Sequence, residues 1–161
     1  MPRSYNLDKN LPTAHQRKPD YMRDDDWIRE FLLHGQIAHI ASVWDDQPFI
    51  TPTTYFYDEA GHRLIFHSNI TGRIRANIEN HPKVCVEVSE LGRLLPSNVA
   101  LEFSLQFRSV VIFGSACILE DKHENVRYFI SSSQNILTNW SWTAIIALPL
   151  LRNWIVLLFM R

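Results

Sequence analysis

The sequence has few of the residues and patterns that mark several common functional classes. Its two cysteines, Cys85 and Cys117, form no CxxC pair, which argues against a disulfide framework or a zinc ribbon. Both lie in apolar, strand-like runs, so we expect buried thiols in a reducing, cytoplasmic compartment. The seven histidines follow no HxH or HExxH spacing, and we expect no metal site. A net charge of −1 with dispersed basic residues predicts no nucleic-acid partner.

Helical patterns are also scarce, and short strand-like runs take their place. We expect helices over residues 27–33 and 72–80, and strands over residues 36–43, 48–57, 63–67 and 83–89. One long bent strand or two shorter strands should follow between residues 99 and 120. Short strands at close spacing with few helices predict a small antiparallel barrel of the α+β class, with an N-terminal helix and one inserted helix.

Individual residues should end these elements. Acidic residues 24–26 can cap the first helix, and Gly35 can close it in a left-handed conformation. Residues 45 and 46, both aspartate, favour a hairpin. Residues 90–98 are expected to form a polar loop, and Gly114 a bulge in the last long run.

Pro52 interrupts the strand expected at residues 48–57. Proline donates no backbone hydrogen bond, so within sheets it is confined to edges, bulges and strand starts. We therefore expect an edge strand, a bulge, or a place where a ligand lies against the sheet.

Residues 64–82 combine a strand, a polar turn and a helix. Ile70, Ile74 and Ile78 recur every four residues, which predicts one apolar stripe that packs inward. A helix N-terminus attracts anions because unpaired N–H groups and the positive end of the helix dipole face them. The turn is therefore a candidate phosphate site, formed by Ser68, Asn69, Thr71, Gly72 and Arg73. The alternative is an ordinary capped helix with solvated arginines.

The C-terminal part of the chain differs in composition from the rest. No charged residue occurs from Tyr128 to Leu151. A membrane-spanning helix needs about 20 consecutive apolar residues, and here Pro149 and Arg152 interrupt the run. The segment is a membrane-seeking segment, a buried strand or helix, or sequence that does not belong to the ancestral domain. We divide the chain into an extended or disordered arm (residues 1–20), a barrel (21–127) and this atypical tail (128–161).

Three segments, in this order, resemble a known family: GQIAHIASVWDDQPFITPTTYFYDE, RLIFHSNITGRIRANIENHPKVCVEV and SVVIFGSACILED. They are similar to the pyridoxamine 5′-phosphate oxidase-like flavin-binding proteins, in the branch that includes nitroimidazole-resistance reductases. The resemblance covers about residues 21–124. It implies a split β-barrel that binds FMN at the interface of a homodimer.

The same resemblance implies FMN-binding positions in three parts of the chain. Those at the phosphate are His67, Ser68, Asn69, Gly72 and Arg73. Arg75 is an additional candidate, although residues two apart on a helix do not share a face. Those along the ring system are Pro52, Thr53 and Thr54. Those on the later strand are Gln106, Ser109 and Val110.

By this resemblance the chain is an oxidoreductase whose FMN passes electrons from a nicotinamide donor to a small-molecule acceptor, such as a nitroaromatic or a quinone. His67 or His39 is a candidate to face the flavin, with an ordinary hydrogen-bonded strand histidine as the alternative for each. A non-catalytic flavin- or haem-binding module and an incomplete variant of the fold are the competing interpretations.

Two features depart from the family pattern. The oxidases proper carry a C-terminal motif with arginine and histidine for the substrate phosphate, and nothing here matches it, so pyridoxamine phosphate oxidation is not supported. The abrupt loss of charge after Arg127 suggests a shifted reading frame, an alternative exon or a read-through end. On that hypothesis the barrel lacks its closing strand and keeps an exposed edge.

Overall fold

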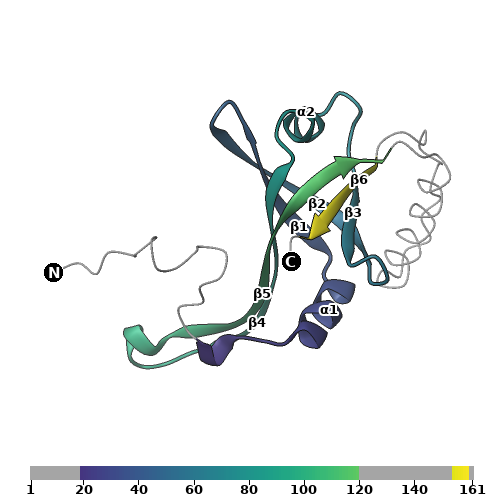
Figure 1. Ribbon diagram of the computed structural model, residues 1–161. Helices are drawn as coiled ribbons and strands as arrows, with labels where there is room; N and C mark the ends of the chain where they lie inside the picture. The colour runs from purple at the N-terminus through teal and green to yellow at the C-terminus, as the bar shows by residue number, and fades with distance from the viewer. Residues whose placement is uncertain (1–18, 120–153, 160–161) are drawn as a thin grey trace, which may run out of the picture.

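Six antiparallel strands and two helices make up the fold (Figure 1). The computed structural model describes residues 19–119 and the backbone of residues 154–159. The elements are η1 (Pro19–Tyr21), α1 (Asp25–His34), β1 (Ile37–Trp44), β2 (Gln47–Asp58), β3 (Arg63–His67), α2 (Arg73–Asn80), β4 (Lys83–Leu95), η2 (Ala100–Glu102), β5 (Ser104–Ile118) and β6 (Trp154–Phe159). The prediction of a mainly antiparallel β fold with two helices is confirmed.

The strands form a closed barrel in the order β1-β2-β3-β6-β5-β4, with β4 paired back to β1. The strand β6 lies between β3 and β5 and pairs with both (Figure 1). The expectation that the barrel lacks a closing strand is therefore wrong, because a strand from the apolar tail occupies that place. Residues 1–18 and 120–153 lie outside the described residues, so the expectations for the N-terminal arm and for most of the tail stay predictions.

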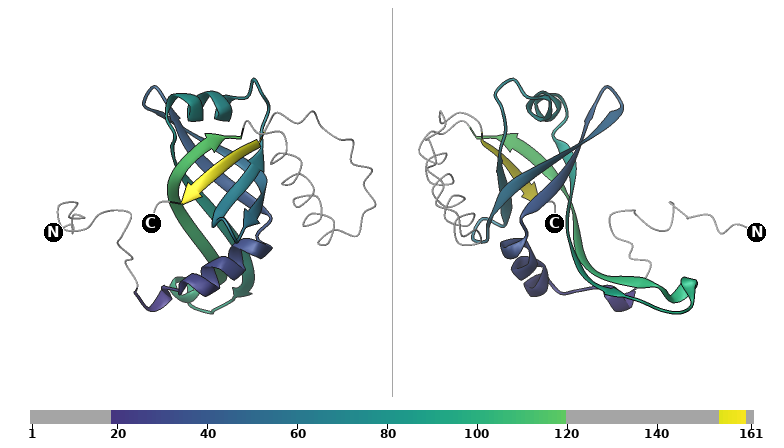
Figure 2. Two further views of the ribbon diagram at one scale, coloured as in Figure 1. Left: turned by 45° about the vertical axis from the view of Figure 1, so that its right-hand side comes forward. Right: turned by 180° about the vertical axis from the view of Figure 1, so that it is seen from behind.

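The barrel core follows from the alternation of side chains along the strands. Inward-facing side chains of five strands are almost fully buried, and they include Tyr57, Phe66, Ile40, Val86 and Ile112. The helix α2 lies across one end of the barrel and α1 across the other (Figure 2). Within the described part of the chain, neither helix has the length and apolar character needed to cross a bilayer.

The hairpin between β1 and β2 is tighter than the sequence indicated. Asp45 and Asp46 both have positive φ, 48° and 59°, as a type I′ turn requires. Trp44 and Gln47 pair directly across them. Short polar aspartates tolerate this left-handed backbone, and so a two-residue turn forms without the usual glycine.

The β4–β5 hairpin extends well beyond the barrel as a two-stranded arm, residues 89–109 (Figure 1). The prediction of a polar loop at residues 90–98 is wrong, since β4 continues to Leu95 and η2 forms the tip of the arm. The register shift lies between Leu91 and Leu94, whereas Gly114 pairs regularly. Leu91, Leu94 and Leu95 lie in this extension, and they leave an apolar surface exposed along the arm.

Gly35 ends α1 in an extended conformation, with φ −64° and ψ 141°, so the expected left-handed closure is wrong. A Cβ at this position would lie 2.2 Å from the Tyr55 hydroxyl and 2.8 Å from Val88. The Tyr55 hydroxyl donates a hydrogen bond to the Leu32 carbonyl at 2.9 Å. Glycine is therefore needed for the close approach of α1 to the barrel.

The expectation of two buried thiols is wrong as well. Cys85 is half-buried and Cys117 is exposed. Both alternate with core residues, Val84 and Val86 in β4 and Ala116 in β5. They therefore occupy positions of the strands that do not face the core.

Candidate functional site

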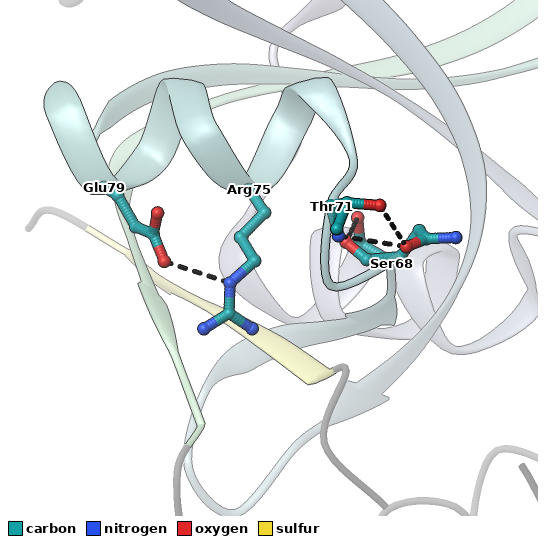
Figure 3. A network of polar contacts seen from close by, with 5 residues as sticks. Ser68, Thr71, Arg75 and Glu79 are labelled. Atoms are coloured by element: carbon teal, nitrogen blue, oxygen red, sulfur yellow. Dashed lines mark hydrogen bonds and ion pairs between the residues drawn. The ribbon is translucent and has the colours of Figure 1, made fainter. Parts of the chain in front are cut away.

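The turn between β3 and α2 is ordered by one asparagine. Asn69 Oδ1 accepts hydrogen bonds from the backbone N of Thr71 at 3.0 Å and from its hydroxyl at 3.1 Å (Figure 3). The backbone N of Gly72 donates to the Asn69 carbonyl at 3.0 Å. These bonds hold the turn in one shape and present the Ser68 and Thr71 hydroxyls beside the start of α2.

Gly72 is the N-cap residue of α2 and leaves a small cradle there. A Cβ on Gly72 would lie 3.1 Å from the Asn69 carbonyl oxygen and 3.3 Å from Ser68 Oγ. Its φ is −74°, so the constraint is the close approach and not the backbone conformation. Glycine at this position therefore lets the turn pack closely against the start of the helix.

Among the residues that the structure describes, no side chain caps α2, and no acidic residue lies in its first turn. The first helical hydrogen bond of α2 is donated by the backbone N of Ala76 to the Gly72 carbonyl. A helix N-terminus of this kind presents backbone N–H groups and the positive end of the helix dipole. An anion such as a phosphate monoester fits these donors.

The two arginines of α2 have different surroundings. The Arg73 guanidinium is exposed and lies over the Phe49 ring, with Cζ 4.6 Å from the ring centroid. Arg75 Nε donates to Glu79 Oε1 at 3.0 Å, one helical turn further along (Figure 3). Arg73 therefore has the freer charge for an anion at the turn, while Arg75 is already neutralised by Glu79.

The expected isoleucine stripe is only partly correct. Ile74 and Ile78 are buried, but Ile70 is 48% exposed because the helix begins at Arg73. The third inward position is Asn77, whose Nδ2 donates to Ser42 Oγ at 2.9 Å. This buried polar pair ties α2 to β1 and fixes where the helix N-terminus lies.

His67 is the last residue of β3, immediately before the turn. Burial lowers the pKa of its imidazole below the ordinary value of 6.5. The side chain is therefore neutral near pH 7, and a positive charge at the turn comes from Arg73.

In the described part of the chain, the stretch of β2 with Pro52, Thr53 and Thr54 pairs with β1 alone, since β3 joins only at Tyr55. The prediction of an edge-like position for Pro52 is confirmed in this sense. Pro52 and Thr54 are exposed on the outside of the barrel, and Thr53 points the other way and is half-buried.

The later-strand residues do not share one surface. Gln106 and Ser109 are exposed, whereas Val110 is 8% exposed and belongs to the core. Ser109 is separated from Thr54 by β1 and β4, a distance of roughly 14 Å at about 4.8 Å per strand. Within one chain, the structure thus places Arg73 against Phe49 of β2 but does not bring Ser109 of β5 to Thr54.

Two contacts were not foreseen from the sequence. Phe49 lies under Arg73, and Asn77 bonds to Ser42. Asn77 follows Ile74 by three positions, so helical spacing places it on the inward face, and this signal was available. Nothing local in the sequence marks Phe49 as a partner of an arginine on a distant helix.

Comparison with known proteins decides the family. Residues 24–148 match the family described as "Pyridoxamine 5′-phosphate oxidase". The chain belongs to this family. The matched range extends beyond Arg127 into the charge-free segment, which weighs against displaced sequence starting there. No curated protein matches the chain.

Several solved structures share the family fold. The flavocytochrome Anf3 from Azotobacter vinelandii is 25% identical, with a TM-score of 0.72 over 93% of this chain and 70% of that chain. An FAD and haem binding protein from Mycobacterium smegmatis is 15% identical, with a TM-score of 0.70 over 86% and 67% of the two chains. A Bacteroides thetaiotaomicron protein named for 5-nitroimidazole antibiotic resistance is 17% identical, with a TM-score of 0.66 over 84% and 78%.

Proposed function

We propose that this chain is an FMN-binding oxidoreductase of the family. The observation that carries the proposal is the N-terminus of α2, which has no capping side chain, a cradle at Gly72 and an exposed arginine. These are the donors and the charge that a phosphate monoester requires. The Ser68 and Thr71 hydroxyls lie at the same turn, where both donate to Asn69 and hold its shape.

The flavin ring would lie along β2, at Pro52 and Thr54. There no strand of the described residues pairs with one side of β2 until β3 joins it, so backbone groups on that side can bond to the polar edge of a ring. Bound FMN supplies hydride and electron transfer. The protein's own groups hold the phosphate, orient the ring and keep the imidazole of His67 neutral. A nicotinamide donor, a small acceptor and a cytoplasmic location complete the proposal.

The site is proposed to be shared between two copies of the chain. If Ser109 and Gln106 contribute to it, they contribute from the partner, because β1 and β4 separate them from β2 in the same chain. A homodimer would meet this requirement, because its two-fold symmetry gives both copies the same contact with their partner.

Comparing FMN with riboflavin tests the phosphate site directly, because riboflavin lacks the phosphate. Titration calorimetry on the full chain should give tighter binding of FMN. Arg73→Ala should weaken FMN binding by about 10- to 100-fold, the usual worth of a charged hydrogen bond, and leave riboflavin unchanged. The matched control is Arg75→Ala, which should leave both affinities near the wild-type values. Equal affinities for FMN and riboflavin in the wild type would contradict the proposal.

Turnover separates the enzyme from a binding module. Steady consumption of NADH or NADPH by the FMN-loaded protein with a nitroaromatic or quinone acceptor would support the oxidoreductase. Tight FMN binding without consumption of either donor would favour a module.

Haem is the second candidate ligand, favoured by the 25% identity to a flavocytochrome over 93% of the chain. Reconstitution with haemin followed by the pyridine haemochrome assay tests it. A stoichiometric haem with an intense Soret band would add haem to the proposal, and the absence of uptake would remove it.

A further inference from the structure

The Arg73 guanidinium is restrained by an aromatic ring and not by a carboxylate. Its Cζ lies 4.6 Å from the centroid of the Phe49 ring, which belongs to a half-buried side chain of β2. Contact of a cation with a ring face at this distance is a cation–π interaction. None of the ion pairs within residues 19–119 involves Arg73. The contact with Phe49 therefore leaves the positive charge of Arg73 uncompensated.

This kind of restraint also leaves hydrogen-bond donors available. A guanidinium has five N–H donors, and a ring face accepts no conventional hydrogen bond. An ion pair, in contrast, uses donors and cancels the charge. Arg75 shows this second case in the same helix, since its Nε donates to Glu79 Oε1 at 3.0 Å. Phe49 thus restrains Arg73 while most of the donors that a phosphate needs remain free.

The place of the Phe49 ring is set by the contact between α2 and the β1–β2 hairpin. Phe49 pairs in register with Ser42 of β1. Ser42 Oγ accepts a hydrogen bond from Asn77 Nδ2 at 2.9 Å, and both of these residues are buried. Asn77 follows Arg73 by four positions, so the two side chains lie on one face of α2. Two paired strand residues thus contact two helix residues one turn apart, which places the ring against the start of the helix.

We propose that Phe49 is a positioning residue for the flavin phosphate and that it acts through Arg73. The proposal rests on the proposed function and adds to it the side chain that prepares the arginine for the ligand. An exposed arginine samples many rotamers, and ordering it on binding lowers the affinity. The ring orders part of this side chain before the ligand binds, so less of that cost remains. FMN gains affinity from the ring, whereas riboflavin, which has no phosphate, does not.

Titration calorimetry on the full chain measures this gain as the affinity for FMN divided by the affinity for riboflavin. Phe49→Leu removes the ring face and keeps an apolar side chain. It should lower this ratio by about 2- to 10-fold, the usual worth of one cation–π contact or one pre-ordered side chain. Phe49→Tyr keeps the ring face and should keep the wild-type ratio. The matched control Phe113→Leu changes another half-buried phenylalanine of the barrel and should leave the ratio unchanged.

Two further measurements show whether the effect passes through Arg73. In an Arg73→Ala background, Phe49→Leu should not lower the ratio again, because the partner of the ring is already gone. Nuclear magnetic resonance of the protein without ligand gives a second test, since protons held over a ring face resonate at lower chemical shift. The Arg73 side-chain protons should show this shift in the wild type and in Phe49→Tyr, and they should lose it in Phe49→Leu.

The outcomes separate this proposal from the one on which it rests. If the wild type prefers FMN and Phe49→Leu keeps the same ratio, Phe49 does not position the arginine, and the phosphate site stands. Equal losses of FMN and riboflavin affinity would give that result and show that the ring is only structural. A second fall of the ratio in the Arg73→Ala background would show that the ring acts through another group. Equal affinities of the wild type for the two flavins would overturn the phosphate site and the role of Phe49 together.

Discussion

The two helices of this chain begin in opposite ways. The helix α1 is capped by Asp24, whose Oδ1 accepts from the backbone N of Trp27 at 2.9 Å, and Asp25 and Asp26 follow in its first turn. The helix α2 begins at Gly72 with no capping side chain and no acidic residue. The first helix satisfies its own N-terminus and the second leaves donors for something else.

Their C-terminal ends differ too. The helix α1 ends at Gly35 against the Tyr55 hydroxyl in the core, whereas α2 ends at His81, which is exposed. The helix α1 is thus fixed at both ends by its own chain. The contrast indicates that α1 serves stability, while α2 gives up local stability at its N-terminus for binding.

The largest effect is expected from giving α2 the cap that α1 has. In Gly72→Asp a carboxylate would occupy the cradle and repel a phosphate, so FMN affinity should fall by more than about 100-fold, as expected when a charged hydrogen-bonding site is lost and a like charge is added. Riboflavin binding should change little, and thermal denaturation measures the net effect of the added cap and of the close approach of its Cβ to the Asn69 carbonyl. The control Gly72→Ala adds the Cβ without the charge, and it should lose less FMN affinity. Unchanged FMN affinity in Gly72→Asp would show that the phosphate does not bind at this helix.

Next in size is the fixed end of α1. Gly35→Ala places a methyl group 2.2 Å from the Tyr55 hydroxyl oxygen, and overpacking of this kind typically costs about 1–3 kcal/mol. Urea denaturation should show the loss. In Gly35→Ala/Tyr55→Phe the clash with the hydroxyl is gone, and part of the stability should return. If the losses of stability from the two substitutions simply add in the double variant, the Tyr55 hydroxyl is not what opposes a methyl group at position 35.

A smaller loss is expected at the other end of α1. Asp24→Ala removes the cap and should lower the free energy of unfolding by about 1 kcal/mol. Asp25→Ala, in the first turn but outside the cap, should cost less. FMN affinity should be the same in both variants, since this helix takes no part in the proposed site. A loss of FMN affinity in Asp24→Ala would mean that the two helices are not independent.

The smallest effect concerns His67, beside the start of α2. Because burial lowers its pKa, the unfolded chain binds a proton at this residue more readily than the folded protein does. The free energy of unfolding should therefore fall as the pH drops from about 7 through the ordinary imidazole value near 6.5. His67→Gln should remove this part of the pH dependence, measured by urea denaturation between pH 5 and 8. The control His81→Gln should not.

Local sequence was sufficient for elements whose ends are set by nearby residues. The bounds of β3 and the end of α2 before Pro82 were predicted, because a proline and a short apolar run carry that information themselves. The Asp24 cap was predicted for the same reason. The turn of the candidate site also lies within a few residues of one segment.

The errors concern contacts between segments distant in sequence. Gly35 was assigned a left-handed backbone because its real constraint, the hydroxyl of Tyr55, comes from another strand. The end of β4 was missed because its extension is set by pairing with β5. The resemblance assigns residues on β2 and β5 to one site, and only the strand order shows that three strand spacings separate them within one chain, so that assignment stays a prediction. Distances of this kind cannot be read from one segment at a time.

The position of β6 in the chain has a consequence for how the protein is made. Trp154 pairs with His67, so one seam of the barrel joins residues that a ribosome adds 87 positions apart. At about 5–20 residues per second, this interval is roughly 4–17 seconds. The strand β5 ends at Ile118, so β3 stays without this neighbour even after β4 and β5 have been synthesised. Survival of the nascent chain therefore depends on what shields that strand, and we expect synthesis rate and chaperone supply to govern the yield of folded protein.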